Sequence, residues 1–397
     1  MTRIAISGGG IGGLTAALAL ADIGCEVDVF EQSDAFSEVG AGIQLAPNAC
    51  RVLHELNVLP LLAGLAIEPT ALEILDGHSR KQLAQMPLGA IAEKRWGAPT
   101  LVVHRADLQQ ALLQAAATRK GVRVHTGATI ADPIIQTDRI TLETPSIGSM
   151  DFDALIGAEG LNSALRSKLF AAPKPEFSHR IAWRNVVPVE MVPAFAKANK
   201  TSLWLGSHAH LVHYPVRGGT LVNVVAITVW HGDASDVTGS NFWDQQIAID
   251  NLYQHFGFWH EDALSLLSSD DNWRCWPLMD SAPNFQWNMG RVALLGDAAH
   301  PTLPFMAQGS AQAIEDAAAL ACLIAAQRTD IPAALARYSQ LRAPRAARVQ
   351  ALSRQQGQIY HLSGIAAFAR NSVMRMMSPE HLAARTDWIY GHDATKC

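Results

Sequence analysis

The stretch RIAISGGGIGG, residues 3–13, decides how this chain begins to fold. Residues 3–7 are a short β-prone run that enters the glycines, and the apolar spacing over residues 11–23 predicts a helix directly after them. Residues 26–30 then alternate like a second strand. Strand, glycine turn, helix and strand together predict a βαβ unit at the start of the chain.

The glycines satisfy the pattern G-x-G-x-x-G that dinucleotide-binding folds carry at this place. Gly8 allows the tight turn, Gly10 lets the backbone approach a pyrophosphate, and Gly13 permits close packing of helix on strand. The helix opens at Ile11 and Gly12, and its first N–H groups favour bound phosphates. The competing interpretation is a glycine-rich turn without a ligand, which the surrounding strand and helix disfavour.

Glu31 and its neighbour Gln32 follow the second strand, where a carboxylate binds the ribose hydroxyls of a dinucleotide. This unit alone does not separate FAD from NAD, and an NAD-only dehydrogenase stays open as an alternative. A second cluster, far along the chain, favours a flavin. Asp297 follows a buried run and suits the ribityl chain of a flavin, and the helix that begins near Gly309 and Ser310 suits the negative charge of a reduced flavin.

The middle of the chain, residues 177–283, changes character. It holds most of the tryptophans and alternating runs at 201–205, 210–216 and 220–230, the last two joined by a turn at 217–219. We therefore expect an α/β chain with an inserted, mainly antiparallel sheet that has the tryptophans in its core. The expected division is a dinucleotide-binding domain in three parts (1–70, 100–176 and 284–345), a substrate domain at 177–283 with an excursion at 71–99, and a C-terminal helical segment at 346–397.

Composition and charge limit the function classes. A net charge of −5 and an isoelectric point near 6.3 give no basic face for nucleic acid or an anionic membrane, so an acidic substrate must be held by local cations. The apolar runs are too short to span a bilayer and we expect no signal peptide, which predicts a cytoplasmic protein. The five cysteines are scattered without metal-type spacing, so we expect free thiols and no metal site.

These motifs resemble those of the single-component, class A FAD-dependent aromatic hydroxylases, the family of salicylate, 3-hydroxybenzoate and 6-hydroxynicotinate monooxygenases. Besides the glycine pattern with Glu31, the resemblance rests on residues 40–44, 104–108, 153–166, 296–301 and 307–316. It implies a Rossmann-like FAD-binding domain of the glutathione-reductase type, with an inserted antiparallel β-sheet substrate domain and a C-terminal helical segment. One departure is Glu159-Gly160, where the family has Asp-Gly, and the role of Glu159 is left open.

The resemblance also implies a cofactor site and a reaction. The cofactor contacts that follow from it are Glu31, Arg105, Asp297, Gly309 and Ser310, with Gly42 and Pro304 as further candidates. In the family, NADH or NADPH docks transiently and reduces FAD, and dioxygen then forms a flavin hydroperoxide whose distal oxygen attacks an electron-rich ring. The implied substrate is a small aromatic compound such as salicylate, a hydroxybenzoate or a hydroxynicotinate, and a homodimer is left open.

The candidates for substrate chemistry are His210, Tyr214, Gln44 and Pro301. His210 and Tyr214 share one face of a strand, and together they are expected to bind and polarise a phenolate or carboxylate oxygen. Gln44 follows a glycine turn that the family places beside the flavin. Pro301 and Pro304 bracket a loop that is expected to cap the flavin pocket. For each of these residues the competing interpretation is purely structural, as a satisfied polar group in a sheet or a rigid turn.

Other functions stay open. A flavin monooxygenase of the same fold with another substrate class (epoxidation, Baeyer–Villiger oxidation or antibiotic modification) would carry the same motifs. A non-catalytic FAD-binding protein is the second alternative, although the intact loop over residues 301–309 favours an enzyme. Neither the ring, nor the position hydroxylated, nor an accompanying decarboxylation is fixed by these motifs.

Overall fold

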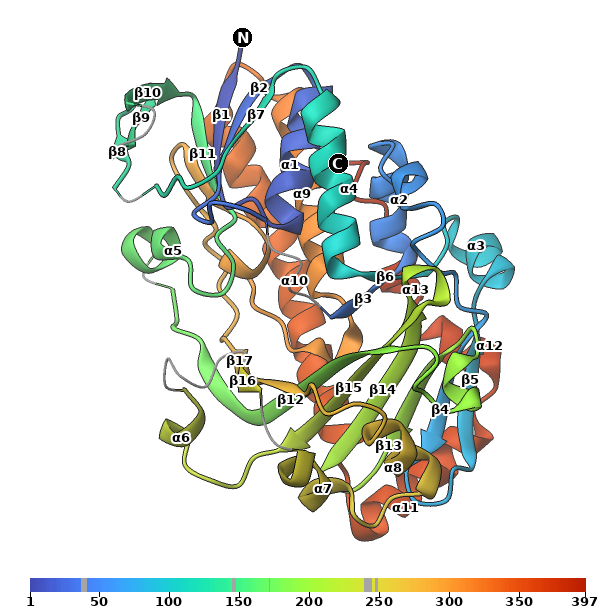
Figure 1. The fold of residues 1–397 in the computed structure, drawn as a ribbon. Helices are drawn as coiled ribbons and strands as arrows, with labels where there is room; N and C mark the ends of the chain where they lie inside the picture. The colour runs from blue at the N-terminus through green and yellow to red at the C-terminus, as the bar shows by residue number, and fades with distance from the viewer. Residues whose placement is uncertain (37–40, 131, 145–147, 171, 239–244, 247–248) are drawn as a thin grey trace.

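The computed structural model describes the chain except residues 37–40, 131, 145–147, 171, 239–244 and 247–248. Gly40 of the 40–44 motif therefore lies outside the described residues. Two large sheets organise the described part, one toward each end of the molecule as drawn in Figure 1.

The first large sheet contains the predicted strand–helix–strand unit. Its order is β18-β19-β11-β1-β2-β7, and the neighbours from β19 to β7 pair in parallel. The strands are β1 (Arg3–Ser7), β2 (Glu26–Phe30), β7 (Val122–His125), β11 (Ala154–Gly157), β18 (Asn288–Met289) and β19 (Val292–Leu294). The helices that pack beside them are α1 (Ile11–Asp22), α2 (Pro47–Glu55), α4 (Arg105–Thr118), α5 (Ala164–Leu169) and α9 (Gly309–Ala326).

The parallel pairing brings three turns to one edge of this sheet. Because β1, β11 and β19 are neighbours, the turns that follow them, at 8–13, 158–160 and Gly296–Ala298, lie at the same edge. Open α/β sheets bind ligands beyond this carboxyl edge. Two smaller sheets are formed by β3 (Gly42–Leu45) with β6 (Leu101–His104), and by β8 (Ile134–Ile135), β9 (Ile140–Thr144) and β10 (Gly148–Phe152).

Close backbone packing explains two of the opening glycines. Gly8 has a φ of +111°, and a Cβ there would lie 2.4 Å from the carbonyl oxygen of Ala158. A Cβ on Gly13 would lie 2.0 Å from the carbonyl oxygen of Gly8. A Cβ on Gly10, by contrast, meets nothing within 4 Å. The turn is therefore packed on its inner side and open where Gly10 lies.

The second large sheet is mainly antiparallel and has the order β16-β17-β12-β15-β14-β13-β4-β5. Its strands are β4 (Ala71–Asp76), β5 (Gln82–Pro87), β12 (Glu176–Pro188), β13 (Thr201–Leu205), β14 (Ala209–Val216), β15 (Leu221–Val229), β16 (Gln245–Gln246) and β17 (Arg274–Asp280). The β4–β5 hairpin joins the sheet through a parallel pairing of β4 with β13. The short helices near this sheet are α3 (Ala90–Trp96), α6 (Ser235–Thr238), α7 (Ile249–Phe256) and α8 (Glu261–Leu267).

One face of the second sheet is sealed by a tryptophan-rich core. Trp183 and Trp204 on the sheet cluster with Trp259 and Trp273 from the α7–α8 region, and all four are buried. This is the core position that the sequence favoured for the tryptophans. The opposite face of β12, β14 and β15 is therefore the one left to look toward the first sheet.

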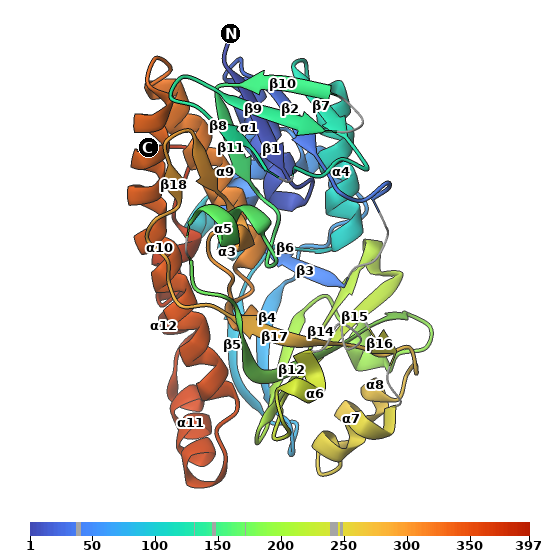
Figure 2. The same cartoon turned by 90° about the vertical axis from the view of Figure 1, so that its left-hand side faces the viewer.

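The C-terminal helices connect the two ends of the molecule. They are α10 (Ile331–Tyr360), α11 (Gly364–Met376), α12 (Pro379–Ala384) and α13 (Asp387–Tyr390). Helix α10 packs on β18 and β19 of the first sheet and continues toward the second, where α11 and α12 pack on β5 (Figure 2). The boundary expected at 345–346 falls inside this continuous helix.

The expectation of five free thiols is wrong for two cysteines. Cys322 on α9 and the C-terminal Cys397 form a disulfide, with their Cα atoms 6.1 Å apart. The 75 residues between them hide the pairing from a spacing argument, since only the return of the chain past α13 brings them together. Cys25, Cys50 and Cys275 are not in the disulfide, and all three are buried.

One described helix, α9, is long and apolar enough to cross a membrane by length and composition. However, 72% of this helix is buried inside the protein, where it packs against α1, α2 and α10. This is the setting of a core helix, whose apolar faces are all covered by neighbours.

His213 supplies a test of the packing on the tryptophan side of the second sheet. It is buried against Phe195 and Trp204, and neither ring nitrogen has a hydrogen-bond partner among the described residues. Burial lowers the pKa of His213 to about 3. The unfolded chain, in contrast, takes up a proton on this ring below about pH 6.5. Stability that depends on neutral His213 is therefore lost as the pH falls below that value.

We predict that His213→Met makes the protein more resistant to acid. Between about pH 7.5 and about pH 5.5, the free energy of unfolding of the variant should improve on that of the wild type by about 1.4 kcal/mol. Denaturant unfolding at the two pH values measures this difference. Methionine at the exposed His54 is the matched control and should leave the pH dependence as it is in the wild type. Parallel pH profiles for His213→Met and wild type would contradict the prediction.

Candidate active site

A cavity of about 380 Å³ lies between the carboxyl edge of the first sheet and the open face of the second. The turn after β1 contributes Gly10, Ile11 and Gly12 to its lining, and β3 contributes Gly42 and Gln44. The remaining walls come from the second sheet and from segments after β19. Both halves of the molecule therefore form one chamber.

Three adjacent strands of the second sheet form the floor of this chamber. Arg184 on β12 lies opposite Val225 on β15, which lies opposite Val212 on β14. Ile227 lies opposite His210 in the next row on the same face. All five side chains line the cavity. The floor is therefore apolar in the middle, with an arginine toward one side and a histidine toward the other.

His210 is held by a second histidine that the sequence did not indicate. Its Nδ1 lies 2.8 Å from Nε2 of His361, which caps the C-terminal end of α10. Burial, reinforced by Arg180, lowers the pKa of His210 to about 3, and burial lowers the pKa of His361 to about 2. Both rings are therefore neutral near pH 7, and in their bond one nitrogen donates while the other accepts.

Tyr214 lies further along the same strand. It is buried and lines the cavity, and burial raises the pKa of its hydroxyl above the usual value although Arg184 opposes the shift. Its ring packs on Gly42, where a Cβ would come within 2.6 Å of it. The Gly42 N–H donates to Oδ1 of Asn223, 2.7 Å away, and this bond fixes β3 and Gln44 above the second sheet.

The predicted cofactor residues divide into those that line the cavity and those that lie outside its lining. Arg105, Asp297, Pro304, Gly309 and Ser310 line it. The cofactor candidates outside the described lining are Gly8, Gly13, Glu31 and Gln32, and Pro301, a candidate for substrate chemistry, also lies outside it.

The residues outside the lining have other contacts. Glu31 accepts hydrogen bonds from the N–H groups of Gly9 (2.8 Å) and Ser33 (3.0 Å), so it buttresses the glycine turn. Gln32 is exposed. Pro301 is buried, and its carbonyl accepts a hydrogen bond from Nε2 of Gln350 at 2.7 Å. Pro301 thus serves to anchor its loop, which is the structural interpretation of this proline.

Asp297 occupies the position at the strand end that the sequence predicted. Its side chain is open to the cavity, yet protein surrounds it, and this burial raises the pKa of the carboxyl group while His300, Arg105 and Arg166 oppose the shift. Beside it, α9 begins at Gly309 and directs its first N–H groups toward the same cavity.

These features fit a flavin dinucleotide. The N-termini of α1 and α9 both open into the cavity, so two points in it favour negative charge, as a diphosphate and a reduced flavin ring require. The open space at Gly10 admits a ligand against the backbone, and Asp297 offers a carboxylate to hydroxyl groups.

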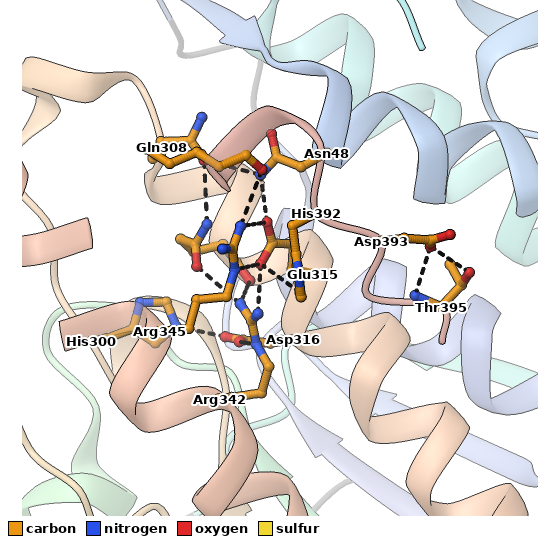
Figure 3. A network of polar contacts seen from close by, with 12 residues as sticks. Asn48, His300, Gln308, Glu315, Asp316, Arg342, Arg345, His392, Asp393 and Thr395 are labelled. Atoms are coloured by element: carbon orange, nitrogen blue, oxygen red, sulfur yellow. Dashed lines mark hydrogen bonds and ion pairs between the residues drawn. The ribbon is translucent and has the colours of Figure 1, made fainter. Parts of the chain in front are cut away.

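A buried ionic network holds the loop that carries Asp297 (Figure 3). Asp316 on α9 accepts hydrogen bonds from the Gly296 N–H (3.0 Å), Nε2 of His300 (2.6 Å) and Nε of Arg342 (2.7 Å). Burial alone would raise the pKa of Asp316, but His300 and Arg342 lower it to about 2. His300, whose ring packs at a tilt against Trp287, therefore supports the loop instead of facing a substrate.

Glu315 extends this network to other helices. It accepts hydrogen bonds from Nη1 of Arg342 (2.6 Å), Nε of Arg345 (2.7 Å) and Nδ2 of Asn48 on α2 (2.6 Å). Although burial raises the pKa of Glu315, the two arginines lower it to about 2. Two consecutive carboxylates on α9 are thereby ionised in the core and tie α2, α9 and α10 together.

The structure answers the question left open about Glu159. Its carboxylate accepts hydrogen bonds from the hydroxyls of Ser7 (3.1 Å) and Ser163 (2.5 Å) and from the N–H of Leu165 (3.0 Å). Glu159 therefore joins the end of β1 to the start of α5. Glu159, which stands where the family has aspartate, therefore has a structural role between β1 and α5.

Sequence reasoning missed two residues of the site, Arg184 and His361. Alternation along β12 places Arg184 on the same face as Ala182 and Val186. The local sequence does not indicate whether this face or the opposite one lies toward the first sheet. His361 is 151 residues from His210 in the chain, and only the full length of α10 brings it there. Arg184 places a cation in the lining of the cavity.

Comparison with known proteins also supports a site for FAD. Residues 1–353 match the family described as FAD binding domain. The 3-hydroxybenzoate 6-hydroxylase 1 of Aquipseudomonas alcaligenes is 36% identical over 395 residues, covering 99% of this chain and 98% of the relative. The 6-hydroxynicotinate 3-monooxygenase of Bordetella bronchiseptica is 33% identical over 358 residues, covering 88% and 90%. The solved salicylate hydroxylase substrate complex has a TM-score of 0.83 at 26% identity and covers 99% of this chain and 96% of that one.

We predict that Asp297→Ala weakens FAD binding roughly ten- to a hundred-fold, because hydrogen bonds to a carboxylate contribute about 1.5–3 kcal/mol. Titration of the cofactor-free protein with FAD measures the affinity, and circular dichroism checks the fold. The exposed Asp271→Ala is the matched control and should bind FAD as the wild type does. A folded Asp297→Ala variant with unchanged FAD affinity would refute the role.

Proposed function

The chain belongs to the FAD binding domain family, and on that premise we propose that it is an FAD-dependent monooxygenase that hydroxylates a small hydroxylated aromatic acid, using NADH or NADPH and dioxygen. The observation that carries the proposal is the chamber itself. Cofactor-type groups at Gly10, Asp297 and Gly309 face an apolar floor that has a cation and a neutral histidine at its sides.

The names of the relatives support the class of substrate. One acts on 3-hydroxybenzoate, another on 6-hydroxynicotinate, and the solved neighbour is a salicylate hydroxylase. Each of these compounds combines a flat ring, a hydroxyl group and a carboxylate. The floor of the cavity offers a matching partner for each: Val212 and Val225 for the ring, His210 for the hydroxyl and Arg184 for the carboxylate.

FAD, when bound, supplies the transfer of electrons from the reduced nicotinamide to dioxygen. The protein must hold the ring, exclude water from it and increase its electron density. Val212, Val225 and Ile227 provide the dry surface on which a ring can lie. His210 and Tyr214 are four residues apart, about 13 Å along an extended strand, so in this proposal they hold different groups of the substrate instead of one shared oxygen.

His210 acts on the hydroxyl group of the substrate. Its Nδ1 is bonded to His361, so Nε2 is the nitrogen left for the substrate. With a pKa of about 3, His210 stays neutral: its Nε2 accepts a hydrogen bond from the substrate hydroxyl group, and its Nδ1–H donates one to Nε2 of His361. The substrate oxygen thereby gains phenolate character, which activates the ring carbon to be hydroxylated.

A substrate screen tests the proposed function. The purified holoenzyme is given 3-hydroxybenzoate, salicylate and 6-hydroxynicotinate with NADH or NADPH, and the oxidation of the nicotinamide and the mass of the product are measured. We expect acid-released FAD, stimulated oxidation with at least one acid, and a product that has gained one oxygen on the ring. Bound FAD without stimulated oxidation would favour a non-catalytic protein, and a different oxygenated product would favour another substrate class.

A second experiment tests the role of His210. We predict that His210→Asn and, more weakly, Tyr214→Phe lower the ratio of hydroxylated product to nicotinamide consumed and release hydrogen peroxide, while FAD stays bound. Since the pKa of His210 is about 3, the wild-type ratio should show no histidine transition near pH 6.5. His213→Asn changes the opposite face of the same strand and is the matched control. Unchanged ratios in His210→Asn and Tyr214→Phe would leave both residues with a structural role.

A further inference from the structure

Arg184 is a cation in the lining of the cavity, and no anionic partner for it lies among the described residues. Its Nε is buried and has no hydrogen-bond partner in the described part of the chain, and its Cζ lies 5.0 Å from the centre of the Trp276 ring. Among the described residues no carboxylate forms an ion pair with it. Stacking on an aromatic face stabilises a guanidinium but leaves its hydrogen-bonding groups free.

The charged groups around Arg184 also leave its positive charge uncompensated. Burial lowers the pKa of Arg184, Tyr214 opposes the shift, and the second cation Arg105 adds to it. The one carboxylate that lines the described cavity is Asp297, and the groups that oppose its pKa shift are His300, Arg105 and Arg166. Buried charges in proteins are ordinarily paired, so an unpaired arginine facing a cavity indicates an anion that arrives with a ligand.

We propose that Arg184 binds the carboxylate of the substrate and makes the enzyme select aromatic acids over neutral phenols. This inference rests on the proposed function and assigns a specificity-determining residue to it. Arg184 and Tyr214 form the carboxylate end of the site, because the Tyr214 hydroxyl stays protonated and can donate beside the guanidinium. His210 forms the hydroxyl end.

The strand register fits a single ring between these two ends. Neighbouring strands are about 4.8 Å apart, so Arg184 on β12 and Val212 on β14 are separated by two such steps, roughly 10 Å, with Val225 between them. Arginine and histidine side chains that extend from the two outer strands leave room for one substituted benzene ring over the valines. The forked guanidinium also matches a carboxylate with two parallel hydrogen bonds.

The cofactor is the other source of an anion, and the fold separates it from Arg184. Gly10 and Gly12, whose backbone would face the phosphates, lie at the start of α1 beside the first sheet, whereas Arg184 lies on β12 in the second sheet. If Arg184 serves the substrate, its loss leaves FAD affinity unchanged. If it serves FAD, its loss weakens FAD binding for every substrate alike.

The experiment compares acids with their uncharged amides. Benzoate and benzamide, then 3-hydroxybenzoate and 3-hydroxybenzamide, are titrated into the holoenzyme near pH 7, and the flavin absorbance reports binding. We expect the wild type to bind each acid roughly ten- to a hundred-fold more tightly than its amide. Arg184→Met should remove this preference by weakening the acid alone, and Arg184→Lys should restore part of it, because lysine keeps the charge without the fork.

Arg180→Met is the matched control. Arg180 lies four positions before Arg184 on the same face of β12, but it stacks on Phe305 and lies outside the described lining of the cavity. Its loss removes the same charge from the same strand and should leave the preference for acids in place. A general electrostatic effect would reduce the preference equally in both variants and would overturn the proposal.

Three further results would overturn it: no preference for acids in the wild type, equal weakening of acid and amide in Arg184→Met, or loss of FAD instead of the acid. The wild-type and Arg184→Lys measurements decide the matter even if Arg184→Met does not fold. Efficient hydroxylation of a neutral phenol without acid selectivity would contradict the role of Arg184 but support the proposed monooxygenase function. Acid selectivity without any hydroxylation would support the role of Arg184 but contradict the proposed function.

Discussion

Two neighbouring carboxylates in the buried core, Glu315 and Asp316, set the constraint on which the rest of the structure depends. An ion in this environment is tolerated only if cations and hydrogen-bond donors surround it, and α10 brings Arg342 and Arg345 for that purpose. The same carboxylates reach α2 through Asn48 and the loop after β19 through the Gly296 N–H. Removing one partner from such a buried group costs on the order of 3–5 kcal/mol, so the helices and the loop are fixed as one unit. The position of Asp297 in the cavity is a direct result.

The floor of the cavity differs from the ionic core, because its polar groups are available to a ligand. In the core network each of the two carboxylates has several hydrogen-bond partners, whereas the floor of the chamber has one cation and one neutral imidazole with nitrogens available to a ligand. The protein as a whole is acidic, with a net charge of −5, so long-range attraction does not draw an organic anion in. Selectivity is therefore a local matter, in which one guanidinium held on Trp276 replaces the hydration that a carboxylate loses on entry.

The local sequence predicted some parts of the fold and of the candidate site but not others. The opening strand, glycine turn and helix were predictable because neighbours in sequence form them, and Gly8 and Gly13 are required by contacts within and beside that turn. Asp297 was predictable because it follows a buried strand at the edge where ligands bind. The Cys322–Cys397 disulfide, Arg184 and His361 were not, since each acquires its role from a partner far away in the chain. Pro301 shows the converse: its position beside the right motif suggested chemistry, but its carbonyl is occupied by Gln350.

Helix α10 has a consequence for how this enzyme can evolve. It is 30 residues long, about 45 Å, and it touches the ionic core with Arg342, the loop at 301–303 with Gln350 and Ser353, and the substrate floor with His361. One added or deleted residue between Arg342 and His361 would turn everything beyond it by about 100° and shift it by about 1.5 Å. The length of the helix thus fixes the distance between the loop that carries Asp297 and the floor of the cavity. Insertions and deletions should accumulate in the loops around it, while the number of residues along this stretch stays constant.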